Sequence, residues 1–113
     1  MTHPKVYVIH EQTRWNEATG KREPTMDLSS AARYGEMVFM LQGDVSHDDE
    51  VNAAILDEKL KEFSTQDFLL LVGSPVLIAC AGAIAFDVAG GTVQFLHWMK
   101  REGQYTVKRV QIW

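Results

Sequence analysis

The sequence predicts an α/β protein, a single compact domain over residues 1–113 with a mixed, mainly parallel five-stranded sheet, flanking helices and a C-terminal antiparallel hairpin. Three observations predict this class. Apolar segments of strand length alternate with helical segments along most of the chain. The last two strand-like segments are joined by a five-residue loop that contains a glycine, as hairpins of this length usually have. At 113 residues, 46% of them hydrophobic, the chain is sized for one core.

The first segment is KVYVIHE, residues 5–11. Its β-branched and aromatic residues lie at neighbouring as well as alternating positions, which favours a strand covered on both faces. Residues 12–26 contain turn-forming residues and predict a long loop or a hairpin that turns at Thr19-Gly20-Lys21. We expect this to be the most exposed stretch of the chain.

A short helix of about two turns is expected next, begun by Asp27 as its cap and ended by Gly35 in a left-handed conformation. Residues 36–42, EMVFMLQ, predict a second buried strand. Apolar residues then recur at near-helical spacing over 51–63, which indicates an amphipathic surface helix with Ser46 or Asp48 as its cap.

The remaining elements are a third strand over 67–73, a helix over about 75–89, and two strands over 92–99 and 105–113. Ser74 and Pro75 are suited to the start of that helix, because serine is a good cap and proline fits the first turn. The parallel strands would be connected by right-handed crossovers.

The uncharged run from Leu69 to Phe86 is nearly long enough to span a membrane. Gly73-Ser74-Pro75 interrupts it after a few residues, and neither Lys nor Arg lies close enough to anchor it among lipid headgroups. A strand, a turn and a helix explain the same residues better. We therefore expect a buried part of the core and no membrane contact.

The turn at Gly73 and Ser74 leaves a second interpretation open. A strand-to-helix turn directs backbone N–H groups and the helix dipole at whatever lies there, and phosphate is a common occupant. The sequence lacks both glycine-rich phosphate motifs, and Pro75 removes one donor. Small residues along this helix are equally explained by close packing on a sheet. Anion or nucleotide binding is the alternative function.

Charge is distributed unevenly along the chain. Residues 1–22 and 100–113 hold eight of the eleven Lys and Arg against three acidic residues, a net charge of +5, which leaves −9 for residues 23–99. If the two ends lay side by side in the fold, one face would be basic and the opposite face acidic.

No pattern of catalytic or metal-binding residues stands out. Cys80 is the only cysteine, which excludes a disulfide framework and a Cys/His zinc site and suits a reducing compartment. The acidic stretch over 46–50 is explained by helix capping and the helix dipole. His10 and His97 fall in expected strands, where core or surface roles are commonest. We expect no catalytic residue, no metal and no cofactor, and we lean towards a protein that is not an enzyme.

The basic ends also carry aromatic residues, which makes them candidate contact sites. A protein partner, including a second copy of the chain, would use the exposed 12–26 segment or the edge strand over 104–113. Single-stranded nucleic acid would use the basic residues together with nearby rings. The candidate partner-binding residues are Arg14, Trp15, Lys100, Arg101, Lys108, Arg109 and Trp113.

Three motifs carry a resemblance to known proteins: D-L-S-S-A-A-x-Y-G-E at 27–36, L-L-x-G-x-P at 70–75 and G-G-x-V-x-x-L-x-W at 90–98. With the order of the segments, they resemble a set of small uncharacterised proteins encoded by tailed bacteriophages and prophages. The resemblance implies a phage product that acts in the bacterial cytoplasm, and the N-terminus lacks signal-peptide features. We expect an accessory protein that binds a host or phage macromolecule, with a protein partner favoured over nucleic acid.

Overall fold

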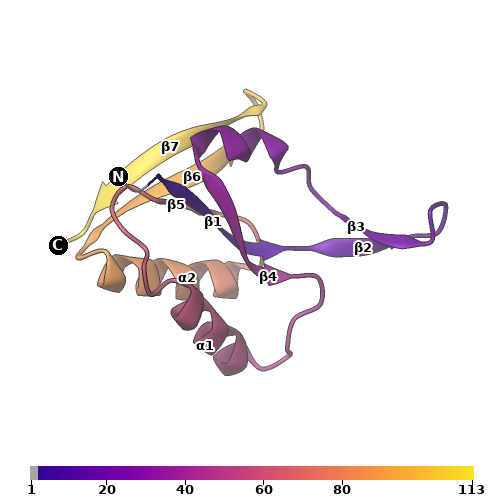
Figure 1. The fold of residues 1–113 in the computed structure, drawn as a ribbon, viewed down its shortest axis with the longest axis horizontal. Helices are drawn as coiled ribbons and strands as arrows, with labels where there is room; N and C mark the ends of the chain where they lie inside the picture. Colours follow the sequence, from indigo (N-terminus) through magenta and orange to yellow (C-terminus); the bar gives the residue numbers. More distant parts are fainter. Residues whose placement is uncertain (1–2) are drawn as a thin grey trace.

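A five-stranded sheet forms the centre of the computed structural model, which describes residues 3–113 (Figure 1). The strand order is β4-β1-β5-β6-β7. Four strands run parallel, and β7 runs antiparallel to β6. These strands are β1 (Lys5–Glu11), β4 (Glu36–Gln42), β5 (Phe68–Leu70), β6 (Thr92–Met99) and β7 (Gln104–Gln111). The predicted fold class is confirmed, including the antiparallel hairpin at the C-terminal end.

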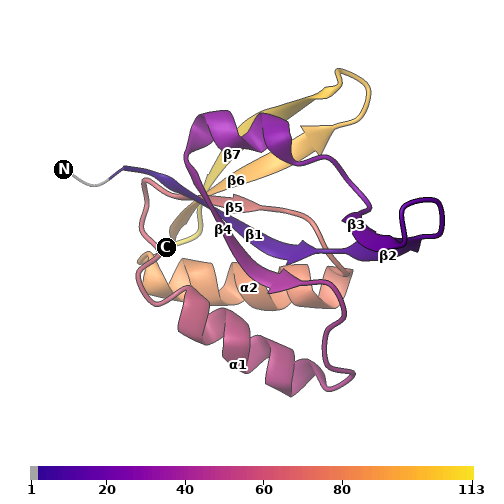
Figure 2. The same ribbon diagram turned by 45° about the vertical axis from the view of Figure 1, so that its right-hand side comes forward.

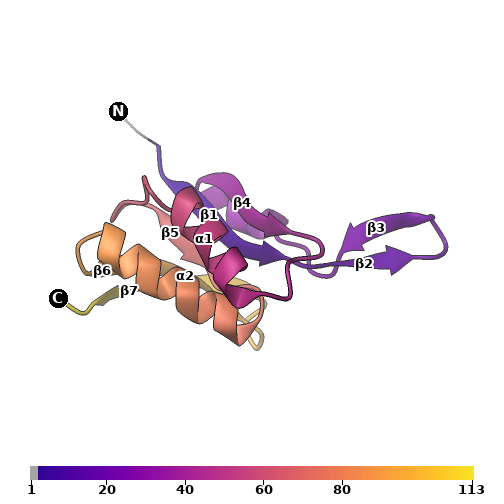
Figure 3. The ribbon, with the colours of Figure 1, turned by 90° about the horizontal axis from the view of Figure 1, so that it is seen from below.

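The helices lie on opposite faces of this sheet (Figures 2 and 3). α1 (Asp49–Lys59) and α2 (Pro75–Val88) pack together against one face. A short 3₁₀-helix, η1 (Ser29–Tyr34), lies on the other face. We call these the α face and the η face. Because η1 is short, it covers much less of the sheet than the two α-helices do.

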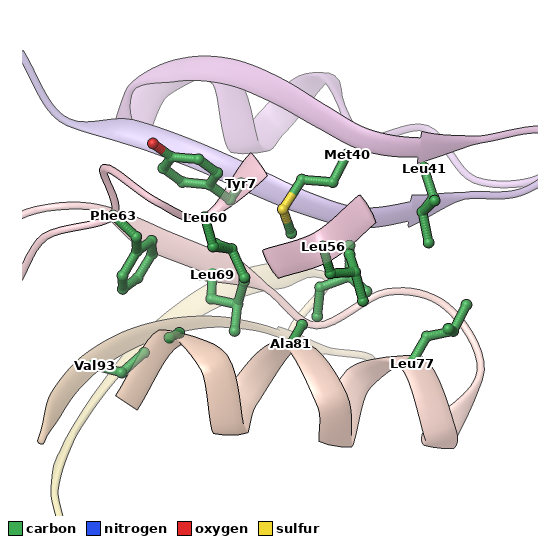
Figure 4. Packing of buried hydrophobic residues seen from close by; sticks show 12 residues of the cluster. Tyr7, Met40, Leu41, Leu56, Leu60, Phe63, Leu69, Leu77, Ala81 and Val93 are labelled. Atoms are coloured by element: carbon green, nitrogen blue, oxygen red, sulfur yellow. The ribbon is translucent and has the colours of Figure 1, made fainter. Parts of the chain in front are cut away.

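The core follows the alternation of side chains along β1. Tyr7 and Ile9 pack on the α face with residues of α1 and α2, among them Leu56 and Ala81 (Figure 4). The intervening Val6 and Val8 pack on the η face with residues such as Ala31. β1 has buried neighbours on both faces, which explains why its apolar residues are adjacent as well as alternating.

Both predicted caps are confirmed at the starts of the α-helices. The Asp48 carboxylate accepts the Glu50 backbone N–H at 2.9 Å, and the Ser74 hydroxyl accepts the Leu77 N–H at 3.4 Å. Pro75 occupies the first turn of α2. These bonds satisfy N–H groups that a helix start cannot pair within itself.

Residues 12–26 form the predicted hairpin rather than a loop. Its strands, β2 (Thr13–Asn16) and β3 (Lys21–Pro24), make a two-stranded sheet of their own. Gly20 has φ +68°, a conformation that glycine adopts without strain. The hairpin projects from one end of the molecule, away from the C-terminus (Figures 1 and 3).

The segment over residues 27–36 differs from its prediction in two ways. The Asp27 carboxylate does accept the Ser29 N–H at 2.9 Å, but the turns that follow are 3₁₀ rather than α-helical. The left-handed Gly35 is wrong, because its φ is 166°, which is extended backbone. Glycine is required there for space, since a Cβ would lie 2.4 Å from the Pro4 carbonyl oxygen.

Three elements also have bounds that differ from the prediction, namely α1, β5 and β7, and the last of these runs over Gln104–Gln111 rather than 105–113. α1 begins at Asp49 and ends at Lys59, so Leu60 and Phe63 reach the core from the turn after the helix. β5 is only three residues long, shorter than the predicted 67–73. The condition for one basic face, that the two basic ends of the chain lie side by side, is not met. In the sheet, β5 and β6 separate β1 from β7.

Candidate protein-binding surfaces

The predicted partner-binding residues lie in three separate places. Arg14 and Trp15 are on the projecting hairpin, Lys100 and Arg101 are in the turn between β6 and β7, and the rest follow β7 towards the C-terminus. The last group consists of Lys108, Arg109 and Trp113. The fold therefore offers distinct surfaces rather than one composite site.

The hairpin presents Trp15 with 58% of its surface exposed. Its neighbour across the strands is Arg22, which donates to the Thr13 hydroxyl at 3.0 Å and forms an ion pair with Asp44 at 3.1 Å. None of the residues of β2 and β3 is buried. The hairpin is thus held by its own backbone pairing and by contacts at its base.

β7 is an edge strand, and exposed apolar side chains lie on it and on the two residues that follow it. Four of the ten large hydrophobic residues that are exposed among residues 3–113 lie on it or just after it: Val107 (40%), Val110 (39%), Ile112 (53%) and Trp113 (66%). Within the described part of the chain, no strand pairs with its outer side. Exposed edges of this kind invite pairing with another strand.

The pairing register places the side chains of β7 on known faces. Lys108 lies opposite Phe95, which packs against the α-face core, so Lys108 points to the α face. Val107 lies opposite Leu96, a member of the η-face core, and Arg109 follows two residues later on the same face. The two basic residues of β7 therefore point to opposite faces of the sheet.

The aromatic rings near these basic residues pack against other rings of the protein. Trp98 and Tyr105 meet edge to face with their centroids 5.0 Å apart, and Tyr105 is buried. The rings of Trp113 and Phe86 meet edge to face with their centroids 6.5 Å apart. Trp113 also lies over Gly91, where an added Cβ would come within 2.6 Å of the tryptophan side chain. Trp113 nevertheless keeps most of its surface exposed. It therefore holds the end of the chain against α2 and Gly91 and still presents apolar surface to a partner.

The start of α2 offers few donors to an anion. Pro75 has no N–H, and the N–H groups of Leu77 and Ile78 both bond to Ser74, at 3.4 Å and 3.0 Å. Only Val76 of the first four helical residues keeps a free N–H. Gly73 has φ +130° and lies against His10, so its role in the turn is explained by backbone conformation and close packing. Anion binding at Gly73 and Ser74 stays an untested prediction.

The two histidines in strands have ordinary surroundings. His10 is buried, and its Nε2 lies 2.7 Å from the Gly43 carbonyl oxygen, so this nitrogen carries the proton. His97 is exposed on β6. Residues 3–113 hold no group of three or more His, Cys, Asp or Glu side chains that could bind a metal ion. No helix in this part of the chain is both long and apolar enough to cross a membrane.

A pocket of about 510 Å³, which sequence reasoning missed, lies on the η face between β4, η1 and the base of the hairpin. Its apolar lining includes Met37 and Phe39 of β4. Carboxylates of Glu11, Glu23 and Asp27 also line it, and the lining contains no Lys, Arg or His. The remaining lining residues are Pro24, Thr25, Met26, Leu28, Ser29 and Ala32.

The three carboxylates of this pocket are bonded to neutral partners. Glu11 accepts from the Gln42 amide at 3.1 Å, and Glu23 accepts from the Asn16 amide at 2.8 Å. The backbone N–H of Ser29 lowers the pKa of Asp27 below its usual value, so this carboxyl is ionised at neutral pH. Neither ion pair found among residues 3–113 involves the three groups. The pocket thus combines an apolar floor with three carboxylates that form no ion pair within residues 3–113, and the basic residue opposite Glu23 in the hairpin is Arg14.

Sequence reasoning could not assemble this pocket, because its lining comes from β1, the hairpin, η1 and β4. One signal was present. β4 is apolar on both faces although it proves to be an edge strand, and an edge strand of that composition leaves apolar surface to be covered.

Comparison with known proteins identifies one family. No curated protein and no solved structure matches the chain. A family model described as "Phage Pam3 gp32-like protein" matches residues 4–112, almost the whole chain. This match agrees with the resemblance to phage-encoded proteins carried by the three motifs. The chain therefore belongs to the family of phage Pam3 gp32-like proteins.

Proposed function

We propose that this phage accessory protein works by binding another protein through the open edge of β7, in the cytoplasm of the infected bacterium. The observation that carries the proposal is the concentration of exposed apolar side chains along this edge, from Val107 to Trp113. An extended partner could add to the sheet with backbone hydrogen bonds and bury these side chains at the same time.

The geometry favours a protein over single-stranded nucleic acid. A nucleic-acid groove would need basic side chains on one face with free rings on which bases stack. Here Lys108 and Arg109 point to opposite faces, and the rings of Trp98 and Tyr105 pack on one another. A protein strand has no such requirement, because it is bound mainly through the backbone.

Site-specific photocrosslinking tests this proposal. A benzoylphenylalanine is placed at Val107 or at Val110, and the protein is irradiated in cells that express the phage genes. We expect adducts with protein at both positions, since the two side chains lie at the open edge on opposite faces. The matched control is the same probe at Ala83, which is exposed on α2 and away from the edge.

The outcomes separate the candidate partners. Protein adducts found at β7 but not at Ala83 support the proposal. Adducts that form equally at Ala83, or only with nucleic acid, overturn it. Labelled single-stranded oligonucleotides provide a second measurement: we expect no binding even at about 0.05 M salt, where contacts with phosphate are strongest.

A further inference from the structure

The sheet has two open edges, and the second lies at β4. β4 reads Glu-Met-Val-Phe-Met-Leu-Gln, with five apolar residues in succession, and no strand of residues 3–113 pairs with its outer side. It lacks the lysines and prolines that usually protect an edge strand from pairing. Met37 and Phe39 are only partly buried, and they line the acidic pocket on the η face. An extended segment placed beside β4 would pair with its outer side and cover the apolar lining of the pocket.

The charges of the two edges are opposite. The pocket beside β4 carries Glu11, Glu23 and Asp27 and no basic residue. β7 carries Lys108 and Arg109 and no acidic residue. Both of these basic residues are exposed, and neither takes part in the ion pairs found among residues 3–113. The chain thus holds an acidic, apolar edge and a basic, apolar edge on opposite sides of one sheet.

The side-chain faces also match. If a second copy continues the sheet with its helices on the same side, its β7 runs antiparallel to β4, because β7 is antiparallel to the four parallel strands. Val107 and Arg109 then point to the η face, the face that holds Met37, Phe39 and the pocket. With Arg109 opposite Phe39, the aliphatic stem of the arginine would cover the apolar floor and its guanidinium would extend to the carboxylates, which lie near the C-terminal end of β4, where Glu11 is opposite Gln42. Val107 would then lie two residues closer to that end of β4.

We propose that the protein associates with itself head to tail: β7 of one copy adds to β4 of the next, and Arg109 of the added strand enters the acidic pocket formed by Glu11, Glu23 and Asp27. The inference rests on the proposed function and names a second copy as the partner of β7. Because the two contacting surfaces differ, association does not stop at a dimer unless a ring closes.

Sedimentation velocity over a range of protein concentrations tests the inference with variants in which the charge of β7 or of the pocket is reversed. Three variants are compared with the wild type: Arg109→Glu, the pocket variant Glu11→Lys/Asp27→Lys, and a control with the same charge change, Glu17→Lys/Asp57→Lys. Glu17 is exposed in the hairpin turn and Asp57 is exposed on α1, on the other face of the sheet. Thermal melting of each variant establishes that it is folded.

We expect the wild type and the control to form species larger than a dimer as concentration rises. Association should weaken as salt increases from about 0.01 M to 1 M, over which the Debye length falls from about 30 Å to about 3 Å. Arg109→Glu and the pocket variant should each associate at least about tenfold more weakly, because like charges then face each other. An equimolar mixture of these two variants should recover association, since the carboxylate introduced on β7 of one variant faces the lysines introduced in the pocket of the other.

Several results would overturn the inference. They are a wild type that stays monomeric at low salt, charge variants that associate as the wild type does, and a mixture that fails to recover. A monomeric wild type whose Val107 probe still crosslinks to a different protein would refute self-association while leaving the proposed function intact. A monomeric wild type together with probes on β7 that form no specific protein adducts would refute both proposals.

Discussion

At the scale of single residues, Asp67 illustrates how a buried carboxylate holds two segments together. Its oxygens accept the Lys5 N–H at 2.9 Å, the Ser64 N–H at 2.9 Å and the Ser64 hydroxyl at 3.1 Å. Asp67 therefore joins the start of β1 to the loop that precedes β5. A buried charge is tolerated here because donors surround it.

We predict that Asp67→Ala lowers the free energy of unfolding by about 3 kcal/mol, because it leaves buried donors unpaired. Urea denaturation measures the change. The control is Asp57→Ala on the exposed side of α1, for which we expect a change within about 0.5 kcal/mol. Equal effects of the two substitutions would show that the bonds of Asp67 contribute nothing specific.

Two glycines give opposite predictions for the same substitution. Gly35→Ala should lower the free energy of unfolding by about 1–3 kcal/mol, since the new Cβ would collide with the backbone of Pro4. Gly82 lies within α2 and has nothing within 4 Å of its Cβ position. Gly82→Ala should raise the free energy of unfolding by about 0.5–1 kcal/mol, because alanine favours the helix. Thermal melting compares the two, and destabilisation by both would contradict the packing described around Gly82.

Because of Tyr7, the free energy of unfolding changes with pH in the alkaline range. Burial, followed by the nearby Asp67 carboxylate, raises the pKa of the Tyr7 hydroxyl above the ordinary value of 10.0. The unfolded chain therefore releases this proton first, so the stabilisation is complete below pH 10 and is lost as the pH rises through the folded-state pKa. Burial, and then Asp27, raises the pKa of Tyr105 in the same direction.

We predict that Tyr7→Phe reduces the loss of stability above pH 10. Urea unfolding at about pH 8 gives the reference difference between the variant and the wild type, and the same measurement at about pH 10.5 should show that difference shifted in favour of the variant. A difference that stays constant between the two pH values would contradict the raised pKa.

At the scale of elements, the β2–β3 hairpin is an appendage to the core. It buries no residue of its own strands, and its ion pair between Arg22 and Asp44 is exposed. The Thr25 N–H donates to the Gln12 carbonyl at 2.9 Å, so the two ends of the hairpin lie side by side. A short turn can therefore replace it without moving the rest of the chain.

We predict that replacing residues 13–24 by Asn-Gly lowers the free energy of unfolding by less than about 2 kcal/mol. Urea denaturation and circular dichroism check this. The shortened protein should also keep the crosslinks made from Val107, because the hairpin and β7 are separate surfaces. Loss of folding would instead mean that the hairpin supports the core, through the pocket it helps to line.

The sequence allowed β1, β4 and β6 to be predicted with their observed bounds, because each is rich in apolar residues and lies between turn signals. The helix caps were equally local. η1 was harder, since the difference between a 3₁₀-helix and two α-turns depends on how Leu28 and Ala31 reach the η-face core. Gly35 was assigned the wrong reason, because the collision that requires glycine is with Pro4, thirty-one residues away in sequence.

The candidate surfaces were predictable only in part. The exposed Trp15 and the edge strand that precedes Trp113 follow from local composition. That Lys108 and Arg109 point to different faces depends on their register with β6, and the acidic pocket depends on the strand order that puts β4 at an edge. Neither the register nor the order is encoded within one segment.

At the scale of the whole molecule, the strand order separates a well-covered centre from two exposed edges. β1 is paired on both sides and has five consecutive buried residues, from Val6 to His10. β7 is exposed over most of its length, and the hairpin shares few contacts with the sheet. Backbone amides should therefore open with different free energies, since local opening is easiest where little is buried.

We predict this order of protection in hydrogen–deuterium exchange at low protein concentration and high salt, where copies should be separate. Amides of β1 should exchange most slowly, amides of β7 and β4 faster, and amides of residues 13–24 fastest. Raising the protein concentration at low salt should then slow exchange in β7 and β4 together, because each edge supplies the hydrogen-bond partners of the other in the proposed assembly. Protection gained in only one of the two strands would contradict head-to-tail pairing, and slow exchange throughout the hairpin would contradict its description as an appendage.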